Sequence, residues 1–118
     1  MFDPELYAAN IRALNQKELA ERSVRLAKAR AEADRLALKI KEGVPGVTEV
    51  YLFGSVATGD VSSSDFDIDL ALDGGDVYAA MDIVLDSEFE VDLVNLSLVP
   101  QTVRERIMSF GITVPVTL

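Results

Sequence analysis

The three aspartates Asp67, Asp69 and Asp92 are the residues of this chain best placed to do chemistry. Asp67 and Asp69 lie two positions apart in the alternating segment 67–72, and Asp92 interrupts a second apolar segment, 90–96. Side chains two apart on a strand leave the same face, about 6–7 Å apart at a rise of about 3.3 Å per residue. If the two strands are neighbours, the three carboxylates form an oxygen-ligand set suited to one or two Mg²⁺ ions.

Each acid also has a simpler interpretation. An isolated Asp-x-Asp pair commonly lies on a solvated outer face, and Asp92 fits an edge or cap position of its strand. The pairing is open as well, because Asp65 and Asp67 have the same spacing as Asp67 and Asp69. We favour Asp67 and Asp69, because apolar residues continue the alternation beyond Asp69 as far as Leu72.

Gly54 and Ser55 follow directly on the β-branched and aromatic segment 47–53. A glycine allows close backbone approach, and a turn that enters a short helix directs N–H groups and the Ser55 hydroxyl at an anion. A Gly-Ser pair alone also marks ordinary turns. Together with the three aspartates, the Gly54-Ser55 pair predicts a turn that binds a phosphate without a basic residue.

Composition limits the chemistry available to this chain. It contains no His and no Cys, which excludes histidine general bases, Ser-His triads, thiol nucleophiles and ordinary zinc sites. An enzyme built from this sequence works with carboxylates, hydroxyls, amines and hard metal ions.

The charges are unevenly distributed along the chain. Residues 1–43 carry nine Lys or Arg and seven Asp or Glu, whereas residues 44–118 carry thirteen acids and only two bases, Arg104 and Arg106. The second part lacks the cationic surface that binding to a nucleic-acid backbone requires, so we expect no direct DNA or RNA binding by it.

Periodicity and breaker residues indicate the elements that position these groups. Strong helix formers fill 5–14 and 17–42, which predicts two helices or one bent helix. Pro115 places the last strand at a sheet edge. The expected fold class is α/β (α+β): a mixed sheet of three to four strands, with helices on one face and a long N-terminal helical extension. Strands are expected at 47–53, 67–72, 90–96 and 112–118, and further helices at 76–86 and 100–110.

An apolar seam follows the second N-terminal helical segment. Leu19, Leu26, Ala33 and Ile40 recur every seven residues, which is typical of a helix face that packs against another element. One interpretation is that the seam covers the protein's own sheet. The other is that a helix of this length overhangs a small domain and pairs with a second chain, which would give a homo-oligomer.

The length of 118 residues supports one core and is too short for two ordinary domains of roughly 100–150 residues each. We expect a single domain over 1–118, with a helical extension at 1–43 and a catalytic core at 44–118. No apolar run approaches the roughly 20 residues of a membrane span, and the first residues lack a secretory pattern, so a cytoplasmic location is expected.

Two stretches combine the features described above: LFGSVATGDVSSSDFDIDLAL at 52–72 and FEVDLVNL at 89–96. Together they resemble the signature of the minimal nucleotidyltransferases of the DNA polymerase β superfamily. That signature has a Gly-Ser pair, a loop, two aspartates separated by one residue, and a third acid on a following strand. The resemblance covers about residues 47–114 and implies the polymerase β-type nucleotidyltransferase fold.

The resemblance also implies a role for each residue of the signature. Gly54 and Ser55 bind the triphosphate of a nucleotide, Asp67 and Asp69 bind the metal ions, and Asp92 is the third carboxylate of the metal site, which activates the acceptor hydroxyl. The acceptor oxygen attacks the α-phosphate and pyrophosphate leaves, while Mg²⁺ offsets the developing charge. ATP is the expected donor.

The chain departs from the family's pattern in two places. Many relatives have ten residues between the serine and the first aspartate, whereas positions 56–66 make eleven. Relatives often carry an arginine before the second glycine of the loop, where this chain has Thr58. A cation for the triphosphate is then expected from Arg104, from Arg106, from the N-terminal helix or from a partner.

The small size of the chain resembles that of family members that act as antitoxins and modify a tyrosine of an all-helical HEPN partner. The leading hypothesis is therefore an adenylyltransferase acting on a hydroxyl of such a partner protein. One alternative is a small-molecule transferase of the aminoglycoside type, although those enzymes usually have an extra substrate-binding domain. The other is a non-catalytic antitoxin module that neutralises its partner by contact through the long helix.

Overall fold

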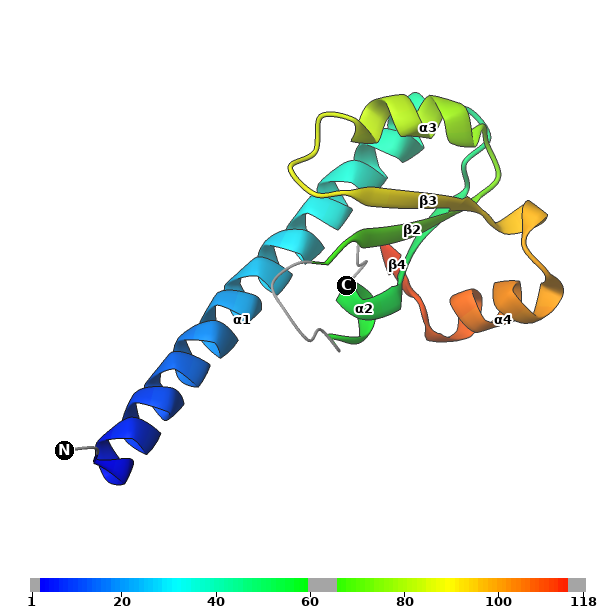
Figure 1. Ribbon diagram of the computed structural model, residues 1–118. Coiled ribbons are helices and arrows are strands. Elements are labelled where there is room, and N and C mark those ends of the chain that lie inside the picture. The colour runs from blue at the N-terminus through cyan, green and yellow to red at the C-terminus, as the bar shows by residue number, and fades with distance from the viewer. Residues whose placement is uncertain (1–2, 60–65, 115–118) are drawn as a thin grey trace.

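The computed structural model describes residues 3–59 and 66–114; residues 1–2, 60–65 and 115–118 lie outside its description. The element order matches the order expected from the sequence (Figure 1). The elements are α1 (Pro4–Gly43), β1 (Glu49–Phe53), α2 (Gly54–Thr58), β2 (Ile68–Asp73), α3 (Val77–Val84), β3 (Val91–Asn95), the 3-10 turn η1 (Leu96–Leu98), α4 (Gln101–Phe110) and β4 (Ile112–Val114).

The described strands form one mixed sheet in the order β3-β2-β1-β4. β1 runs antiparallel to both β2 and β4, whereas β2 and β3 are parallel. A parallel pair requires a crossover, and α3 supplies it. The expected mixed sheet is confirmed with four strands. β4 lies at a sheet edge, as predicted, although Pro115, on which that prediction rested, is outside the described residues.

α1 is one uninterrupted helix rather than two. Its N-cap, Asp3, accepts hydrogen bonds from the backbone N–H groups of Glu5 and Leu6 at 3.0 and 3.3 Å, and Pro4 takes the first helical position. No glycine or further proline occurs before Gly43, so the helix continues to that residue.

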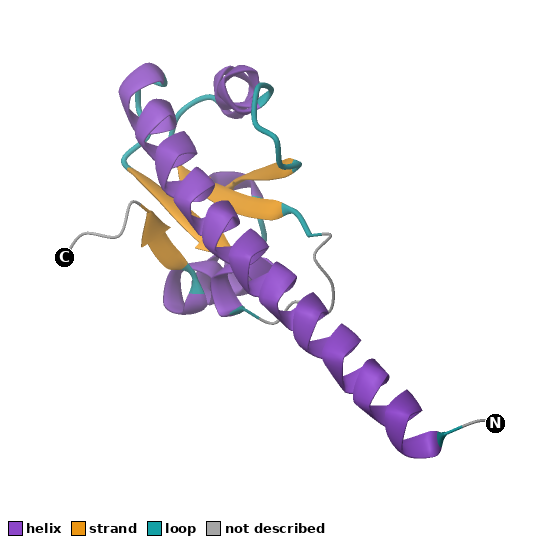
Figure 2. Cartoon of the chain, turned by 90° about the vertical axis from the view of Figure 1, so that its left-hand side faces the viewer, coloured by secondary structure: helices purple, strands orange, loops and turns teal. Residues whose placement is uncertain are grey.

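Alternation along β2 separates its side chains onto two faces, as predicted. Ile68, Leu70 and Leu72 are fully buried in the larger core, which α1 and α3 cover (Figure 2). The C-terminal half of the apolar seam therefore packs on the protein's own sheet. The buried residues that α1 contributes are Ala29, Ala33, Leu36, Ala37 and Ile40.

α4 covers the opposite face of the sheet. Its Ile107 packs with Ala71 and Leu96 in a smaller core, beside the rings of Tyr51 and Phe53. The expectation of helices on one face is met by α1 and α3, whereas α4 lies on the other, because its apolar side finds Ala71 and its neighbours there. Asp69, two residues before Ala71 on the same face, remains only partly buried.

The first half of α1 extends past the sheet (Figures 1 and 2). Residues 4–21, which we call the overhang, are all exposed, and Leu19 of the seam is 58% exposed. The helix of 40 residues is about 60 Å long at 1.5 Å per residue, which explains the principal extents of 67 × 31 × 27 Å. No helix within the described residues is long and apolar enough to cross a membrane.

Candidate active site

β1, β2 and β3 place three paired residues side by side at the end of the sheet where β1 ends and β2 and β3 begin. Asp69 of β2 pairs with Phe53 of β1 on one side and with Asp92 of β3 on the other. The side chains of Asp69 and Asp92 therefore leave the same face of adjacent strands, and the two carboxyl groups are hydrogen bonded. The condition set by the sequence, that the strands carrying these acids be neighbours, is met.

The environment of Asp69 raises its pKa to about 6. Partial burial is the largest cause, because it removes the carboxylate from water; the charge and hydrogen bond of Asp92 and the charge of Asp67 add to it. Above this pKa two carboxylates face each other, unless a cation takes the place of the proton. A cation bound beside the pair would relieve the repulsion between the two acids.

Asp67 lies at the margin of this pair. β2 begins at Ile68, one residue later than expected, so Asp67 precedes the strand. Its charge acts on Asp69, but within residues 3–59 and 66–114 no three acidic side chains are gathered into a ready-made metal site. The competing residue, Asp65, lies outside the described residues, so the choice between the two aspartate pairs stays a prediction.

Gly54 lies directly against the Asp69 carboxylate. Its φ is 75°, in the left-handed region that favours glycine, and a Cβ at this position would stand 2.2 Å from Asp69 Oδ2. Asp69 therefore leaves no space for a side chain at position 54. The Gly-Ser turn and the second aspartate form a single site, with Ser55 next to it at the start of α2.

α2 is held at its C-terminal end by an arginine of α1, whereas its N-terminal end has no side-chain cap. Its N-cap, Phe53, provides no side-chain hydrogen bond, so the first N–H groups of α2 receive no side-chain cap. At the other end, Arg30 of α1 donates from Nε to Val56 O at 3.1 Å and from Nη2 to Ala57 O at 3.4 Å. A cation is favourable at a helix C-terminus, so Arg30 positions the turn that carries Gly54.

A second arginine of α1 reaches the Asp67 side of the site. Arg25 lies over the ring of Phe89, 4.2 Å from its centroid, and Phe89 stacks on Phe66 with centroids 6.5 Å apart. These residues line a polar hollow together with Asp67.

Sequence reasoning missed both Arg25 and Arg30. The signal available for them was position: each adjoins a residue of α1 that packs in the core, Leu26 or Ala29, and so flanks the helix face that lies on the sheet. Their partners, Phe89 and Val56, lie far along the chain, and helical spacing does not identify such contacts.

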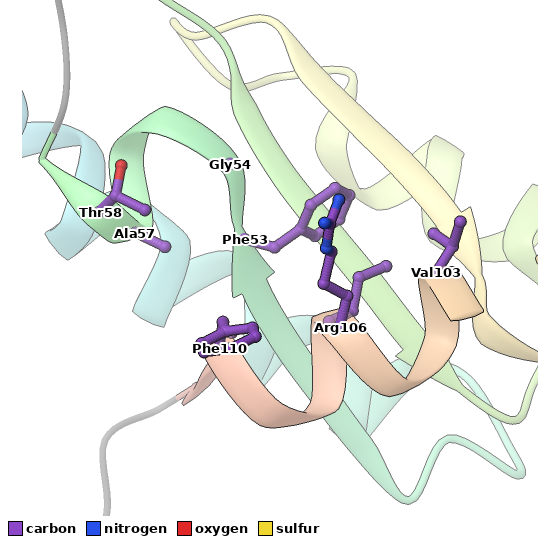
Figure 3. Close-up of a pocket in the computed structure, with 9 residues that line it drawn as sticks. Phe53, Gly54, Ala57, Thr58, Val103, Arg106 and Phe110 are labelled. Carbon is purple, nitrogen blue, oxygen red and sulfur yellow. The ribbon is translucent and has the colours of Figure 1, made fainter. Parts of the chain in front are cut away.

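A pocket opens on the other side of Gly54, between α2 and α4 (Figure 3). Its volume is about 280 Å³, near the lower end of the range of roughly 300–1,000 Å³ for ligand pockets. The lining is mostly apolar and includes one charged side chain, that of Arg106. The lining residues are Phe53, Gly54, Ala57, Thr58, Val103, Arg106, Ile107, Phe110 and Gly111.

Comparison with protein families identifies the class to which this fold and site belong. The model of a family described as polymerase beta, nucleotidyltransferase matches residues 36–115, which is more than half of the chain. The chain therefore belongs to the polymerase β nucleotidyltransferase family. The matched range begins near the end of α1 and includes all four strands, so it leaves out the overhang and both Arg25 and Arg30.

Solved structures share the fold at low sequence identity. A toxin–antitoxin complex with AMP-PNP matches with a TM-score of 0.58 and 23% identity, over 71% of this chain and 73% of that one. A variant of the MntA–HpeT toxin–antitoxin matches with a TM-score of 0.54 and 19% identity, over 75% and 73% of the two chains. A candidate nucleotidyltransferase from Sulfolobus solfataricus gives 0.54 and 18%, over 79% and 85%. Comparison with curated proteins gives no match.

Proposed function

We propose that this protein is a Mg²⁺-dependent nucleotidyltransferase that moves AMP from ATP to a hydroxyl group of a partner protein and releases pyrophosphate. The observation that carries the proposal is the contact among Asp69, Asp92 and Gly54 at the open end of the sheet. In a chain of this family, that contact joins a carboxylate pair to the turn expected to hold the donor's phosphates.

The donor set fits Mg²⁺. Asp69 and Asp92 offer carboxylate oxygens on adjacent strands, and Asp67 adds a third acid at the margin of this pair. Partial burial, followed by the neighbouring Asp92 and Asp67, raises the pKa of Asp69. Hard oxygen ligands of this kind suit Mg²⁺, and we assign Asp67, Asp69 and Asp92 to hold it. When bound, the metal offsets the negative charge that develops on the transferred phosphate and on pyrophosphate.

The remaining steps belong to the chain's own residues. Gly54, which has no side chain, lets the backbone of the turn approach the Asp69 carboxylate closely. The Ser55 hydroxyl and the uncapped N–H groups of α2 hydrogen bond to the triphosphate. Asp92, on the open side of the sheet, accepts the proton of the acceptor hydroxyl as that oxygen attacks the α-phosphate.

Exposure favours a macromolecular acceptor over a small molecule. Asp92 is exposed, and α4 covers only the part of the face near Ala71, so a protein hydroxyl can approach from solvent. Two of the structural neighbours reported above are toxin–antitoxin structures, one of them with AMP-PNP. By analogy, we assign this chain an antitoxin role, with a small helical partner of the HEPN type.

The overhang is the surface that we assign to that partner. Leu6, Ile11, Leu14 and Leu19 are each between 39% and 60% exposed there, on the part of α1 that extends past the sheet (Figure 1). A helix with exposed apolar side chains is suited to pack against the helices of a second protein.

Intact-mass measurement tests the proposal. The protein is co-purified with its bound partner, and the pair is incubated with Mg²⁺ and each nucleoside triphosphate in turn. We expect the partner to gain one nucleoside monophosphate with ATP and Mg²⁺, and to gain nothing with EDTA or with the Asp69→Asn variant. A tight complex that neutralises its partner without any mass gain would instead establish the non-catalytic contact module.

A further inference from the structure

The pocket between α2 and α4 has the form of a ligand site with one charged side chain. Phe53 and Phe110 provide aromatic surface, and Val103 and Ile107 of α4 add aliphatic surface. Phe110 is 78% exposed despite its size, and Val103 is 42% exposed. Gly54 lines the same pocket, so this apolar surface is continuous with the carboxylate site around Asp69.

Most cations of the described chain already have a structural role. Arg22, Arg35, Lys39 and Lys41 form ion pairs. Arg30 is bound to carbonyl groups at the far end of α2 from Gly54.

Two further arginines also have contacts within the chain. Arg25 stacks on Phe89, and Arg104 donates from Nε to Leu96 O at 2.9 Å. Arg104, which the sequence offered as one source of a phosphate-binding cation, is therefore bound to backbone instead.

Arg106 is the cation that borders the pocket. It is exposed, and Figure 3 shows its side chain extending from α4 toward the end of β1, where Phe53 and Gly54 lie. The described part of the turn on the other side, Gly54–Gly59, contains no Lys or Arg. Arg106 thus brings a positive charge to the pocket, beside the site assigned to the phosphates.

We propose that this pocket receives the base and ribose of the donor nucleotide and that Arg106 binds its phosphates. The inference rests on the proposed function, and it assigns a subsite and a residue that the aspartates do not define. Bases stack on aromatic rings, which gives the exposed Phe110 a partner. The planar guanidinium forms paired, charge-assisted hydrogen bonds to phosphate oxygens, and it would offset the repulsion between a triphosphate and the three aspartates.

Nucleotide binding by variants of the full chain tests the assignment. Titration calorimetry with Mg²⁺ identifies which of ATP, GTP, CTP and UTP binds the wild-type protein most tightly, and that triphosphate and its free nucleoside are then the probes. We expect Arg106→Gln to weaken triphosphate binding by on the order of tenfold or more, as for a lost charge-assisted contact, and to change nucleoside binding far less. Phe110→Ala should weaken both probes.

Matched variants separate this effect from general charge and from folding. Lys39→Gln also removes one positive charge, from an exposed ion pair with Asp86 away from the pocket, and should bind both probes as the wild type does. Arg106→Lys keeps the positive charge but loses the planar guanidinium and its paired hydrogen bonds, so it should bind the triphosphate with intermediate affinity. Melting temperatures of all variants confirm that each is folded.

The outcomes distinguish a failure of the role assigned to Arg106 from a failure of the proposed nucleotidyltransferase function. Wild-type binding that Arg106→Gln leaves unchanged overturns the role of Arg106 while the nucleotidyltransferase function stands. Equal losses for triphosphate and nucleoside in Arg106→Gln overturn its assignment to the phosphates. Absence of binding by the wild-type protein, for all four triphosphates with Mg²⁺, overturns the proposed function and this inference with it.

Discussion

The carboxyl group of Asp69 is partly withdrawn from water beside Asp92, and its pKa is raised to about 6 from an ordinary value of 3.8. An acid whose pKa is higher in the folded state favours folding when it is protonated. Its contribution is fully present below the unfolded value and is lost as the pH rises through about 6. At neutral pH the residue assigned to the metal therefore destabilises the protein without metal.

Replacing Asp69 should therefore stabilise the metal-free protein while weakening its response to Mg²⁺. In EDTA at neutral pH, Asp69→Asn should melt at a higher temperature than the wild type, and the difference should shrink as the pH falls from about 6 toward 4. Saturating Mg²⁺ should raise the melting temperature of the wild type more than that of the variant. Thermal unfolding across this pH range measures both effects.

Asp82→Asn, an exposed change on α3, serves as the control for that experiment and should show neither effect. If Asp69→Asn melts below the wild type at every pH in EDTA, then Asp69 stabilises the fold and the electrostatic interpretation is wrong.

Gly54 meets two constraints at once, a φ of 75° and the Asp69 carboxylate 2.2 Å from the position of a Cβ. Gly54→Ala should therefore lower the free energy of unfolding by about 1–3 kcal/mol or more, the range for a strained backbone residue. Asp69→Ala in the same chain should recover part of this loss, because it removes the clash but not the strain. Denaturant unfolding of the two single variants and the double variant gives the coupling.

Gly43→Ala is the matched control, because that glycine has no positive φ and a Cβ there would only approach the tip of Ile83. Strictly additive losses at Gly54 and Asp69 would show that the two residues do not meet.

The choice between the two aspartate pairs is decided by activity. Asp69→Asn should reduce transfer by on the order of 10²–10³ or more, by comparison with the loss of one preorganised electrostatic group. Asp65→Asn should keep activity within roughly tenfold, about 1.4 kcal/mol of barrier. Asp67→Asn should be damaging for either pair, and Asp92→Asn tests the third carboxylate. Single-turnover rates from the intact-mass assay measure all four; the reverse order for Asp65 and Asp69 would move the metal pair to Asp65 and Asp67.

At the scale of elements, α1 does more than cover the sheet, because Arg30 binds the carbonyl groups at the end of α2. Arg30→Gln should lower the free energy of unfolding by only about 1 kcal/mol, since the side chain is largely exposed. It should accelerate amide exchange in 54–59 and reduce nucleotide transfer, because the turn is less firmly placed. Hydrogen exchange by mass spectrometry reports on that segment.

Arg22→Gln, which removes an arginine of the same helix from a partly exposed pair with Glu18 at 3.5 Å, provides the comparison. Equal exchange in 54–59 for both variants would mean that α2 holds its place without Arg30.

At the scale of the whole molecule, the overhang presents apolar side chains that are 39% to 60% exposed. We expect the protein to be an oligomer in solution, or a monomer only when its partner is absent. Leu14→Glu should then weaken self-association or partner binding, because it places a charge among the exposed apolar residues of α1. Light scattering after size-exclusion chromatography measures both.

Leu85→Glu, on a residue that is 78% exposed outside the overhang, should leave association unchanged. A monomer whose residues 4–21 are uniformly and strongly protected from hydrogen exchange would contradict the expectation, since that segment would then be part of the core.

The sequence by itself determined what depends on short-range patterns. Alternation in 67–72 placed the side chains of Asp69 and Leu70 on opposite faces of one strand, and the breaker residues indicated where elements begin and end. Both follow from the sequence because side-chain period and turn chemistry are local properties. The same patterns, with the Gly-Ser and Asp-x-Asp spacing, were enough to indicate the family that the comparison establishes.

Only the tertiary structure decided which residues of different elements meet. The contact of Gly54 with Asp69 depends on the pairing of β1 with β2, and that of Asp69 with Asp92 on the parallel register of β2 and β3. Alternation within one segment fixes which side chains share a face. It does not fix which strand is the partner or which residues of that strand lie opposite, because both depend on two segments at once. The sequence also did not show where along α1 the helix stops packing on the sheet. Leu19 and Ile40 have the same position in the seven-residue spacing, yet Leu19 is exposed and Ile40 is buried, because the sheet extends under only the second of them.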